Sequence, residues 1–403
     1  MTGAAKTTAP MAILVINAGS SSLKFALFES SGALRQLAGG QVERIGRGPR
    51  LRAARDGESP QLRELAVDAD QAQALDAVLG WIEANLPELC IAVVGHRVVH
   101  GGSDFVAPVV VDEAVLARLE QLDPLAPLHQ PHNLAAIRRL RALHPDLAQI
   151  ACFDTAFHAH WPDRARRFAL PRTLHDAGVR RYGFHGLSYE FLAGEVARLA
   201  PQARRCVLAH LGSGASVCAV RDGVSLDCSL GFTALDGLPM GTRCGPLDPG
   251  VPFHLLRTSG MDADAIESLL YHGSGLLGVS GLSADVRDLL ASDATEAREA
   301  LDLFVYQCAR QIAAMTVALG GIEALVFAGG IGENAVPIRA EIAAALDWLG
   351  VRLDAAANAG GGHGARVINA TNAPVQVLVI PTDEEIVIAR ACQSHLAASM
   401  PAA

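Results

Sequence analysis

Lysine is scarce in this sequence of 403 residues, which holds only two lysines, Lys6 and Lys24, against 31 arginines. The formal net charge is −9, and no basic block is longer than a few residues. Binding to nucleic acid needs a concentrated positive face, so we expect no nucleic-acid partner. Lys24 lies within a run of glycine and serine. Its retention there indicates a need for a compact ammonium group, with chance as the alternative explanation.

Paired cysteines and long apolar runs are also missing. The eight cysteines are scattered, without a C-x-x-C pair or a zinc-like spacing, which is typical of reduced thiols in a reducing compartment. The first ten residues, MTGAAKTTAP, lack the apolar run of a signal peptide, and no apolar stretch reaches the length of a membrane span. We therefore expect a cytoplasmic protein that has no membrane partner.

What the sequence does contain is an internal repeat. The chain has 403 residues, of which half are hydrophobic, and this length suits two domains of ordinary size. Met11–Ile16 and Leu23–Phe28 are predicted strands on either side of a small-residue turn at Asn17–Ser22. The same figure recurs at Cys206–His210 and Val217–Val220. The repeat predicts an α/β fold made of two duplicated domains that flank a cleft.

The spacing of apolar residues predicts further elements. We expect helices at Ala72–Asn85, Asp112–Leu122 and Ala297–Leu319, and buried strands at Ile91–Val99, Ile150–Phe153 and Ala324–Ala328. The charged stretch Gly46–Arg63 is expected to be an irregular surface excursion. A final helix over Glu384–Ala398 is expected to pack on the first domain, which makes that domain discontinuous.

The first turn has the composition of an anion-binding loop. Gly19 permits close approach of the backbone, Ser20 and Ser22 offer hydroxyl and N–H donors, and Lys24 supplies a positive charge. The pattern differs from the G-x-x-x-x-G-K-[ST] loop, and a strand follows it instead of a helix. A polar hairpin turn without a ligand is the alternative interpretation.

Charged residues stand at the C-terminal ends of two predicted strands. Arg97 stands near the end of an apolar strand and beside glycines, where it can bind a carboxylate or a phosphoryl group in bidentate fashion. Asp154 comes directly after another apolar strand. It either caps the next helix or acts on a metal ion or a proton.

Three further glycine-rich blocks contain candidate residues. His185 lies between glycines in RYGFHG, and Arg243 lies in GLPMGTRCG, so both are candidates to stabilise transferring negative charge. The block AGGIGEN, which ends at Asn334, follows an apolar strand and opens a helix, an arrangement that suits nucleotide binding. It matches G-x-G-x-x-G poorly, which disfavours a dinucleotide-binding enzyme.

Together these blocks resemble the acetate kinase family, within the superfamily of paired ribonuclease-H-like domains that includes sugar kinases, actin and Hsp70 chaperones. The resemblance runs from about Ile13 to about Arg390. Its motifs, in the family's order, are INAGSSSLKF, GHRVVHGG, FDTAFH, RYGFHG, HLGSGAS, GLPMGTRCG, AGGIGEN and PTDEE. It implies two ribonuclease-H-like, actin-like ATPase domains, one of residues 11–154 plus 385–403 and a nucleotide-binding one of residues 155–384.

The resemblance also implies roles for single residues. Asn17 and Glu384 would hold Mg²⁺, for which Mn²⁺ can substitute, while Arg97, Asp154, His185 and Arg243 would be catalytic. Arg97 would also bind the substrate, with an acyl pocket formed by Val99, Leu128, Phe184 and Ala234. Residues expected at the nucleotide are Lys24, Ser20, Ser22, His210, Leu211, Gly212, Ser213, Gly214, Asp285, Val286, Arg287, Gly330, Ile331, Gly332, Glu333 and Asn334.

Four positions depart from the family's pattern. Ser213 replaces an asparagine in H-L-G-N-G, Tyr189 stands where histidine is common, and Asp383 stands where asparagine is common. Ala234 replaces a proline of the acyl pocket, and the lost bulk would ease the entry of propionate. One methylene in such a pocket is worth only about 1–3 kcal/mol, so the substrate's length stays open.

The implied reaction is reversible in-line transfer of the ATP γ-phosphoryl group to acetate, by a protein that the resemblance makes a homodimer. A carboxylate is already ionised at neutral pH, so the reaction needs no strong general base. Asp154 is therefore better suited to organise metal or water than to accept a proton. The alternatives are a propionate or butyrate kinase and, in another class, a nucleotide-gated binding or chaperone-like protein.

Overall fold

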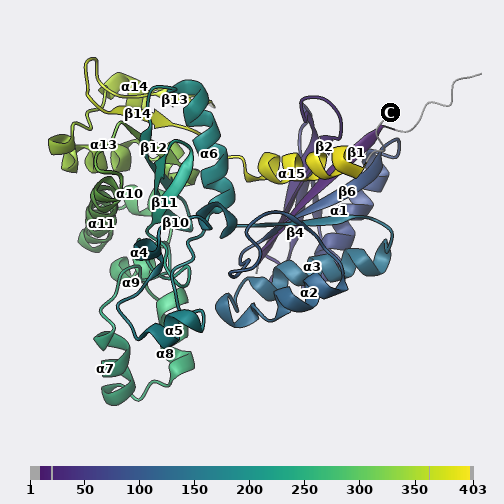
Figure 1. Cartoon of the computed structure of the whole chain (residues 1–403), viewed down its shortest axis with the longest axis horizontal. Coiled ribbons are helices and arrows are strands. Elements are labelled where there is room, and N and C mark those ends of the chain that lie inside the picture. The colour runs from purple at the N-terminus through teal and green to yellow at the C-terminus, as the bar shows by residue number, and fades with distance from the viewer. Residues whose placement is uncertain (1–9, 20, 363, 400–403) are drawn as a thin grey trace, which may run out of the picture. The chain divides into compact units, whose positions relative to one another are not determined.

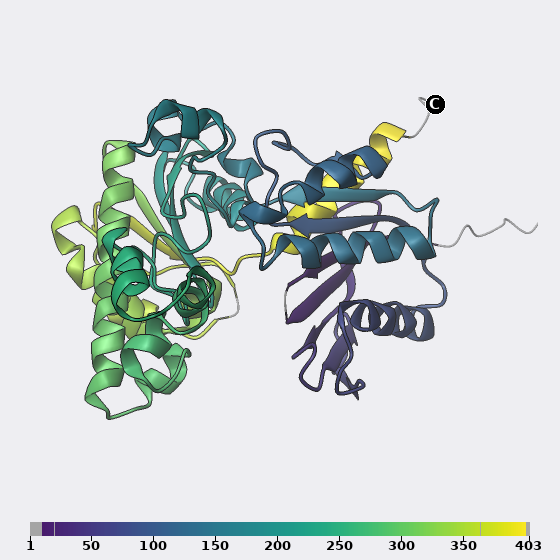
Figure 2. The same cartoon turned by 90° about the horizontal axis from the view of Figure 1, so that it is seen from below.

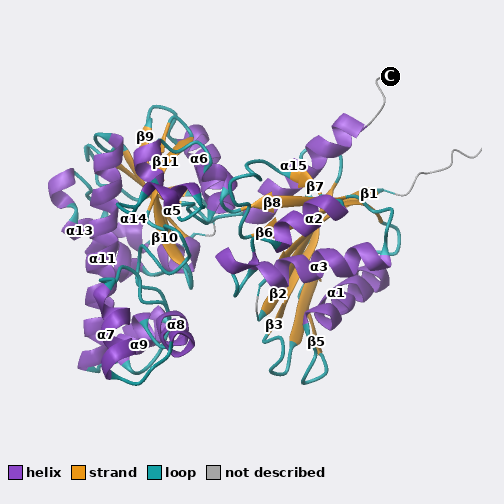
Figure 3. Ribbon diagram, turned by 60° about the horizontal axis from the view of Figure 1, so that its bottom comes forward, coloured by secondary structure: helices purple, strands orange, loops and turns teal. Residues whose placement is uncertain are grey.

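The chain folds into two compact units in the computed structural model, which describes residues 10–19, 21–362 and 364–399. One unit is formed by residues 1–156 and 383–403, and the other by residues 157–382. Each unit has its own β-sheet with helices packed on it (Figures 1 and 3). Both units are therefore α/β layers.

The first unit is built on an eight-stranded sheet with the order β5-β4-β3-β2-β1-β6-β8-β7. Strands β5 to β1 pair in antiparallel fashion, β1, β6 and β8 are parallel, and β7 is antiparallel to β8. The strands are β1 (Met11–Ala18), β2 (Ser22–Glu29), β3 (Gln36–Glu43), β4 (Arg50–Arg55), β5 (Gln61–Glu64), β6 (Cys90–Val98), β7 (Val109–Val110) and β8 (Gln149–Phe153).

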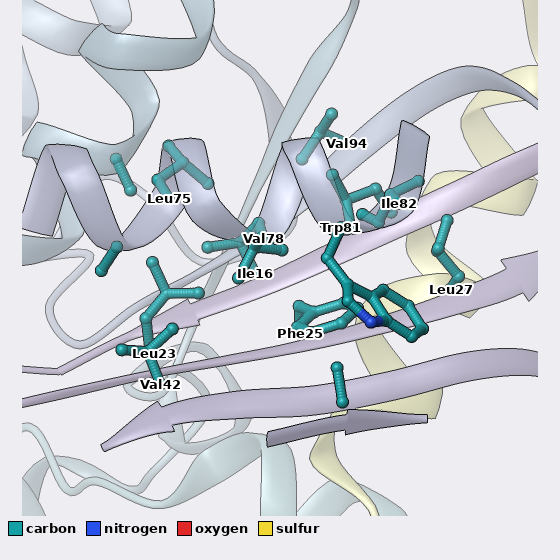
Figure 4. Packing of buried hydrophobic residues seen from close by; sticks show 14 of the residues in the cluster. Ile16, Leu23, Phe25, Leu27, Val42, Leu75, Val78, Trp81, Ile82 and Val94 are labelled. Atoms are coloured by element: carbon teal, nitrogen blue, oxygen red, sulfur yellow. The ribbon is translucent and has the colours of Figure 1, made fainter. Parts of the chain in front are cut away.

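Helices pack on both faces of this sheet. They are α1 (Gln71–Asn85), α2 (Glu113–Glu120), α3 (Gln130–Leu143), α15 (Glu384–Ser399) and the short 3₁₀ turn η1 (Asp123–Leu125). Val94 of β6 belongs to the core cluster under α1, where Phe25 and Trp81 also pack (Figure 4). The next residue, Gly95, faces α15, because a Cβ there would lie 2.3 Å from Ile388. Successive strand residues point to opposite faces, so α1 and α15 cover opposite sides of the sheet.

The second unit is built on a six-stranded sheet with the order β11-β10-β9-β12-β14-β13. Its strands are β9 (Arg205–Leu211), β10 (Ala215–Arg221), β11 (Val224–Cys228), β12 (Ala324–Ala328), β13 (Arg366–Val367) and β14 (Gln376–Val379). The long helix α11 (Thr295–Leu319) lies along β9 and β10 (Figure 2). The other helices are α4 (Asp163–Arg166), α5 (Arg172–Asp176), α6 (Gly186–Leu199), α7 (Gly250–Thr258), α8 (Ala263–His272), α9 (Gly275–Ser280), α10 (Val286–Leu290), α12 (Gly329–Asn334), α13 (Val336–Ala345) and α14 (Ala355–Ala359), with 3₁₀ turns η2 (Ala156–His158) and η3 (Asp347–Leu349).

The two sheets repeat one pairing pattern. The series β3-β2-β1-β6-β8 has two antiparallel pairs followed by two parallel pairs, and the series β11-β10-β9-β12-β14 has the same. In each, an antiparallel hairpin is followed by parallel strands that need crossover connections. This pattern confirms the duplicated α/β fold that the internal repeat predicted.

Most of the predicted elements are confirmed, including the final helix α15, which packs on β1 and β6. The prediction for Gly46–Arg63 was wrong, because this stretch contains β4 and the start of the edge strand β5. In β4 the buried Leu51 and Ala53 alternate with the exposed Arg50 and Arg52, a pattern typical of a strand with one buried face. The charge of the exposed face had hidden that alternation. Within the part of the chain that is described, no helix is long and apolar enough to cross a membrane.

Candidate functional site

Arg97, near the end of β6, is the centre of a polar cluster in the first unit. Its guanidinium donates to both carboxylate oxygens of Asp154, with Nε–Oδ1 and Nη2–Oδ2 distances of 3.1 Å and 2.6 Å. Its Nη1 donates to Asn17 Oδ1 at 3.2 Å, and its Nε lies 3.7 Å from Glu384 Oε2. Asn17, Asp154 and Glu384, which are far apart in the sequence, therefore meet around one guanidinium. We call these four residues the arginine cluster.

The arginine cluster carries an excess of acid. Burial raises the pKa of Glu384 to about 7, and although Arg97 opposes this shift, Asp154 and Glu385 add to it. Burial disfavours the charged form of Arg97, but Asp154 and Glu384 together raise its pKa. One guanidinium thus faces several carboxylates in a low-dielectric setting, where an added cation would be stabilised.

The sheet itself brings these groups together. Strands β1, β6 and β8 are parallel neighbours, so Asn17, Arg97 and Asp154 lie where their carboxyl ends meet. Glu384 is the first residue of α15, which packs on β1 and β6. Lys24 pairs directly with Asn17 across the β1–β2 hairpin, and its charge lowers the pKa of Glu384. Both residues lie in strands, although the sequence had predicted Asn17 in a turn.

Two buried residues of α3 fix the backbone around the arginine cluster. The Asn133 side chain donates to the carbonyl of Ala18 at 2.5 Å and accepts from the N–H of Val99 at 2.9 Å. Gln130 pairs with both the N–H and the carbonyl of His100. Neither residue was predicted from the sequence, and no helix was predicted over α3. The available signal was a pair of amides at i and i+3 among apolar residues at helical spacing.

The oxygen atoms of the arginine cluster are suited to a divalent metal ion. Hard cations such as Mg²⁺ take carboxylate and amide oxygens, which Glu384 and Asn17 present to the same guanidinium. Among the described residues, no three His, Cys, Asp or Glu side chains form a group that could hold a metal ion. The residues present fit a cation to which the protein supplies few ligands, while water or substrate supplies most of them.

His185 and Arg243 come together in the second unit. A Cβ built on Gly214 would lie 3.2 Å from His185 Nε2 and 3.9 Å from Arg243 Nη1, so both side chains border the space beside this glycine. The His185 ring stacks on His210, with centroids 4.6 Å apart. Its Nδ1 lies 2.8 Å from Ser216 Oγ. The structure thus places an imidazole and a guanidinium against one hairpin.

That hairpin adjoins the start of α12. A Cβ on Gly212 would lie 3.8 Å from the backbone nitrogen of Gly330, and one on Gly329 would collide with the carbonyl of Leu211 at 2.7 Å. Gly329 also has a φ of +74°, which favours glycine. Ser213 is exposed at the tip of the hairpin. Two glycine-rich backbones that approach so closely, with few side chains between them, can present N–H groups to phosphate oxygens.

The C-terminal end of α12 is held by a buried arginine that was not predicted from the sequence. Arg339 is fully buried and donates to the carbonyls of Gly332 and Glu333, each at 2.9 Å. It also donates to the side chain and the backbone carbonyl of Asn358, at 2.7 Å and 2.8 Å. Ile331 and Asn334 belong to the same short helix. The nearby Arg366 donates to the Glu333 carbonyl at 3.2 Å.

The remaining predicted residues divide between the units. In the first unit, Val99 is buried and Leu128 is half-buried. In the second unit, Phe184 is buried and Ala234 is half-buried. The carbonyl of Ala234 accepts a hydrogen bond from Arg243. Asp285 caps α10 and pairs with the exposed Arg287, on either side of the buried Val286. Ser20 lies outside the described residues.

The fold and these side chains define a class: a duplicated α/β protein with cationic side chains gathered beside glycine-rich or polar groups in both units. The model of the Acetokinase family matches residues 12–390, and the chain belongs to this family. It is 51% identical to an acetate kinase of Rhodopseudomonas palustris over 385 residues, which cover 94% of this chain and 96% of the relative.

Solved structures are also similar. A propionate kinase from Francisella tularensis has a TM-score of 0.88 at 34% identity, with 94% of this chain and 98% of that one covered. An acetate kinase from Porphyromonas gingivalis has a TM-score of 0.86 at 36% identity, with 96% and 100% covered.

Proposed function

We propose that this chain is an ATP:acetate phosphotransferase, which transfers the γ-phosphoryl group of ATP to acetate, reversibly and by in-line displacement, to give acetyl phosphate and ADP. Membership of the Acetokinase family and the acetate kinases among its relatives support this function. The observation that carries it most directly is the meeting of His185 and Arg243 beside Gly214.

Each group has a charge-stabilising role in this reaction. The transferring phosphoryl group spreads negative charge over its three equatorial oxygens, and enzymes of this kind act mainly by positioning and electrostatic stabilisation. His185 and Arg243 offer N–H donors to those oxygens, while Arg97 binds the acyl substrate. Asp154 orients the Arg97 guanidinium through its bidentate pair, which fits its expected role as an organiser better than a role as a base.

The metal ion and the assembly belong to the same proposal. We assign Mg²⁺, or Mn²⁺ in its place, to Asn17 and Glu384 on the basis of their oxygens and the excess of acid around Glu384. Such an ion neutralises charge on the ATP phosphates. The family resemblance supports a homodimer, and the sequence supports a cytoplasmic location.

A propionate kinase is the second candidate. Ala234 stands where the resemblance implied a proline, and the smaller side chain would leave more room for a longer acid. The structurally similar Francisella tularensis protein is a propionate kinase. Comparison of kcat/KM for the two-, three- and four-carbon acids separates the candidates, since one methylene changes the ratio by about 10- to 200-fold.

The decisive experiment is ADP release from ATP with acetate present and then omitted. We expect acetate-dependent ADP formation. Arg97→Ala and Arg243→Ala should each lower kcat by about 100-fold or more, as loss of one transition-state donor does. Arg257→Ala, which changes an exposed arginine of α7, is the matched control. ATP binding without acid-dependent ADP formation would favour the nucleotide-gated binding protein, and normal turnover in a folded Arg97→Ala or Arg243→Ala protein would refute the assignment.

A further inference from the structure

A chain of hydroxyl groups runs from the interior of the second unit to His185. Tyr189, one turn into α6, makes a short hydrogen bond with Ser216 Oγ on β10, and Ser216 Oγ lies 2.8 Å from His185 Nδ1. Tyr189 and Ser216 are both fully buried. The protein therefore has to supply the donors and acceptors of this chain.

The recorded partners set the direction of these hydrogen bonds. Among the described residues, Ser216 Oγ is the only side-chain hydrogen-bond partner recorded for the buried Tyr189 hydroxyl, and a buried O–H needs an acceptor. The phenol hydrogen is then left for Ser216 Oγ. Ser216 has a single hydrogen of its own, which goes on to His185 Nδ1. A nitrogen that accepts carries no proton, so the neutral ring has its proton on Nε2.

The reverse direction would leave a hydrogen without an acceptor. If His185 Nδ1 donated to Ser216, and Ser216 to Tyr189, the Tyr189 oxygen would accept from Ser216. Its own hydrogen would then need a further acceptor, and the hydrogen bonds of the described residues provide none. In a fully buried site a polar hydrogen without an acceptor is strongly unfavourable, which makes the first direction the stable one.

The position of Nε2 decides whether His185 can donate a hydrogen bond to an anion. Nε2 and Arg243 Nη1 border the same space beside Gly214. The ring cannot easily turn, because it stacks on His210, whose own Nδ1 is 2.8 Å from Ser188 Oγ. A lone pair on Nε2 would repel an anionic oxygen in that space, whereas an N–H would bind it. The neutral ring also avoids a second cation beside the guanidinium.

We propose that Tyr189, acting through Ser216, is a positioning residue that holds His185 in the Nε2–H tautomer and so makes it a hydrogen-bond donor to the transferring phosphoryl group. The role in transfer rests on the proposed function, but the tautomer does not. The sequence had marked Tyr189 only as a departure from the family's histidine.

Nuclear magnetic resonance of protein labelled with ¹⁵N-histidine tests the tautomer without any assay of activity. The signals of His185 are identified by their loss in His185→Gln, at a pH where the ring is neutral. We expect the Nε2–H pattern in the unmodified protein and a mixture of tautomers in Tyr189→Phe, because Ser216 is then free to accept from Nδ1–H. Tyr306→Phe, which removes the same hydroxyl from an exposed tyrosine of α11, should keep the original pattern.

Two results would overturn the proposal: an Nδ1–H pattern in the unmodified protein, or an unchanged Nε2–H pattern in Tyr189→Phe. If Tyr189→Phe does not fold, Ser216→Ala breaks the same chain of hydrogen bonds with a smaller change. A mixture of tautomers in Ser216→Ala would then support the proposal, and an unchanged Nε2–H pattern would overturn it. A folded state is checked by circular dichroism.

Kinetics then link the tautomer to transfer. Tyr189→Phe should lower kcat by about two- to tenfold, since part of the molecules keep the donor, and leave KM for ATP nearly unchanged. A shifted tautomer with unchanged kcat would refute the role in transfer. If the unmodified protein shows no acetate-dependent turnover while the Nε2–H tautomer is observed, the proposed function fails and the tautomer assignment stands.

Discussion

Replacement of Arg339 by methionine tests whether a buried arginine without an acidic partner stabilises this fold. Arg339 is fully buried, and its recorded partners in the described chain are four oxygen acceptors rather than a carboxylate. Burial, together with the charge of Arg366, lowers its pKa to about 10, so it remains a cation at neutral pH. Methionine keeps the apolar stem and removes every donor.

The expected loss follows from those four acceptors. A hydrogen bond to a charged group contributes about 1.5–3 kcal/mol, and a buried acceptor left unpaired costs about 1–3 kcal/mol. The desolvation of the guanidinium, which the mutation relieves, offsets part of this sum. We therefore expect Arg339→Met to lower the free energy of unfolding by about 3–5 kcal/mol.

Urea unfolding followed by circular dichroism measures this loss at pH 7. The matched control is Arg298→Met on α11. Arg298 forms ion pairs with Asp302 and Glu341 but is half exposed, so its loss should cost less than about 1 kcal/mol. Arg339→Lys should recover only part of the stability, because an ammonium cannot match the planar fork of donors.

The reasoning would be refuted if Arg339→Met were no more destabilising than Arg298→Met. A functional consequence is also expected, since Arg339 holds the Gly332 and Glu333 carbonyls of α12. In a variant that still folds at the assay temperature, KM for ATP should rise more than kcat falls.

Two further changes follow from the second unit. Gly214→Ala would place a methyl group 3.2 Å from His185 Nε2, at a φ that alanine tolerates. We therefore expect kcat to fall by about 100-fold, while the free energy of unfolding changes by less than about 1 kcal/mol. Gly194→Ala, in open space on α6, is the control, and equal turnover of the two variants would contradict the proposed site. Burial lowers the pKa of His158 to about 4, below its unfolded value near 6.5. The unfolded chain therefore binds the extra proton between these values, and stability is lost as the pH falls through them. Between pH 7 and pH 5 the unfolding free energy should drop by about 2 kcal/mol more than in His158→Asn, and parallel pH profiles would exclude this role.

The elements were predictable where local pattern alone decides them. β12 begins and ends at the predicted residues, and α1 and β6 lie within one residue of theirs. Strand β4 and the edge strand β5 were missed, because only Leu51 and Ala53 are buried in β4 and every residue of β5 is exposed. Such a weak apolar signal becomes visible only when the neighbouring strand β3 is known.

Candidate motif residues could be proposed from the sequence because their chemistry is local, as in the glycine hairpin ending at Gly214 and the strand-end Arg97. Their partners were a matter of tertiary structure. Asp154 reaches Arg97 because β6 and β8 are parallel neighbours, and Glu384 reaches it because α15 returns to that sheet. Strand order decides which strand ends meet, and no single segment encodes that order.

The sequence by itself determined the duplicated α/β plan, the glycine-rich turns and the residue types able to handle a phosphoryl group. The tertiary structure alone decided that Tyr189, Ser216 and His185 form one hydrogen-bonded chain and that Arg339 contacts backbone carbonyls. Both depend on which polar groups are buried together. Periodicity reports whether a side chain is buried, but only the packed fold decides which donor meets which acceptor there.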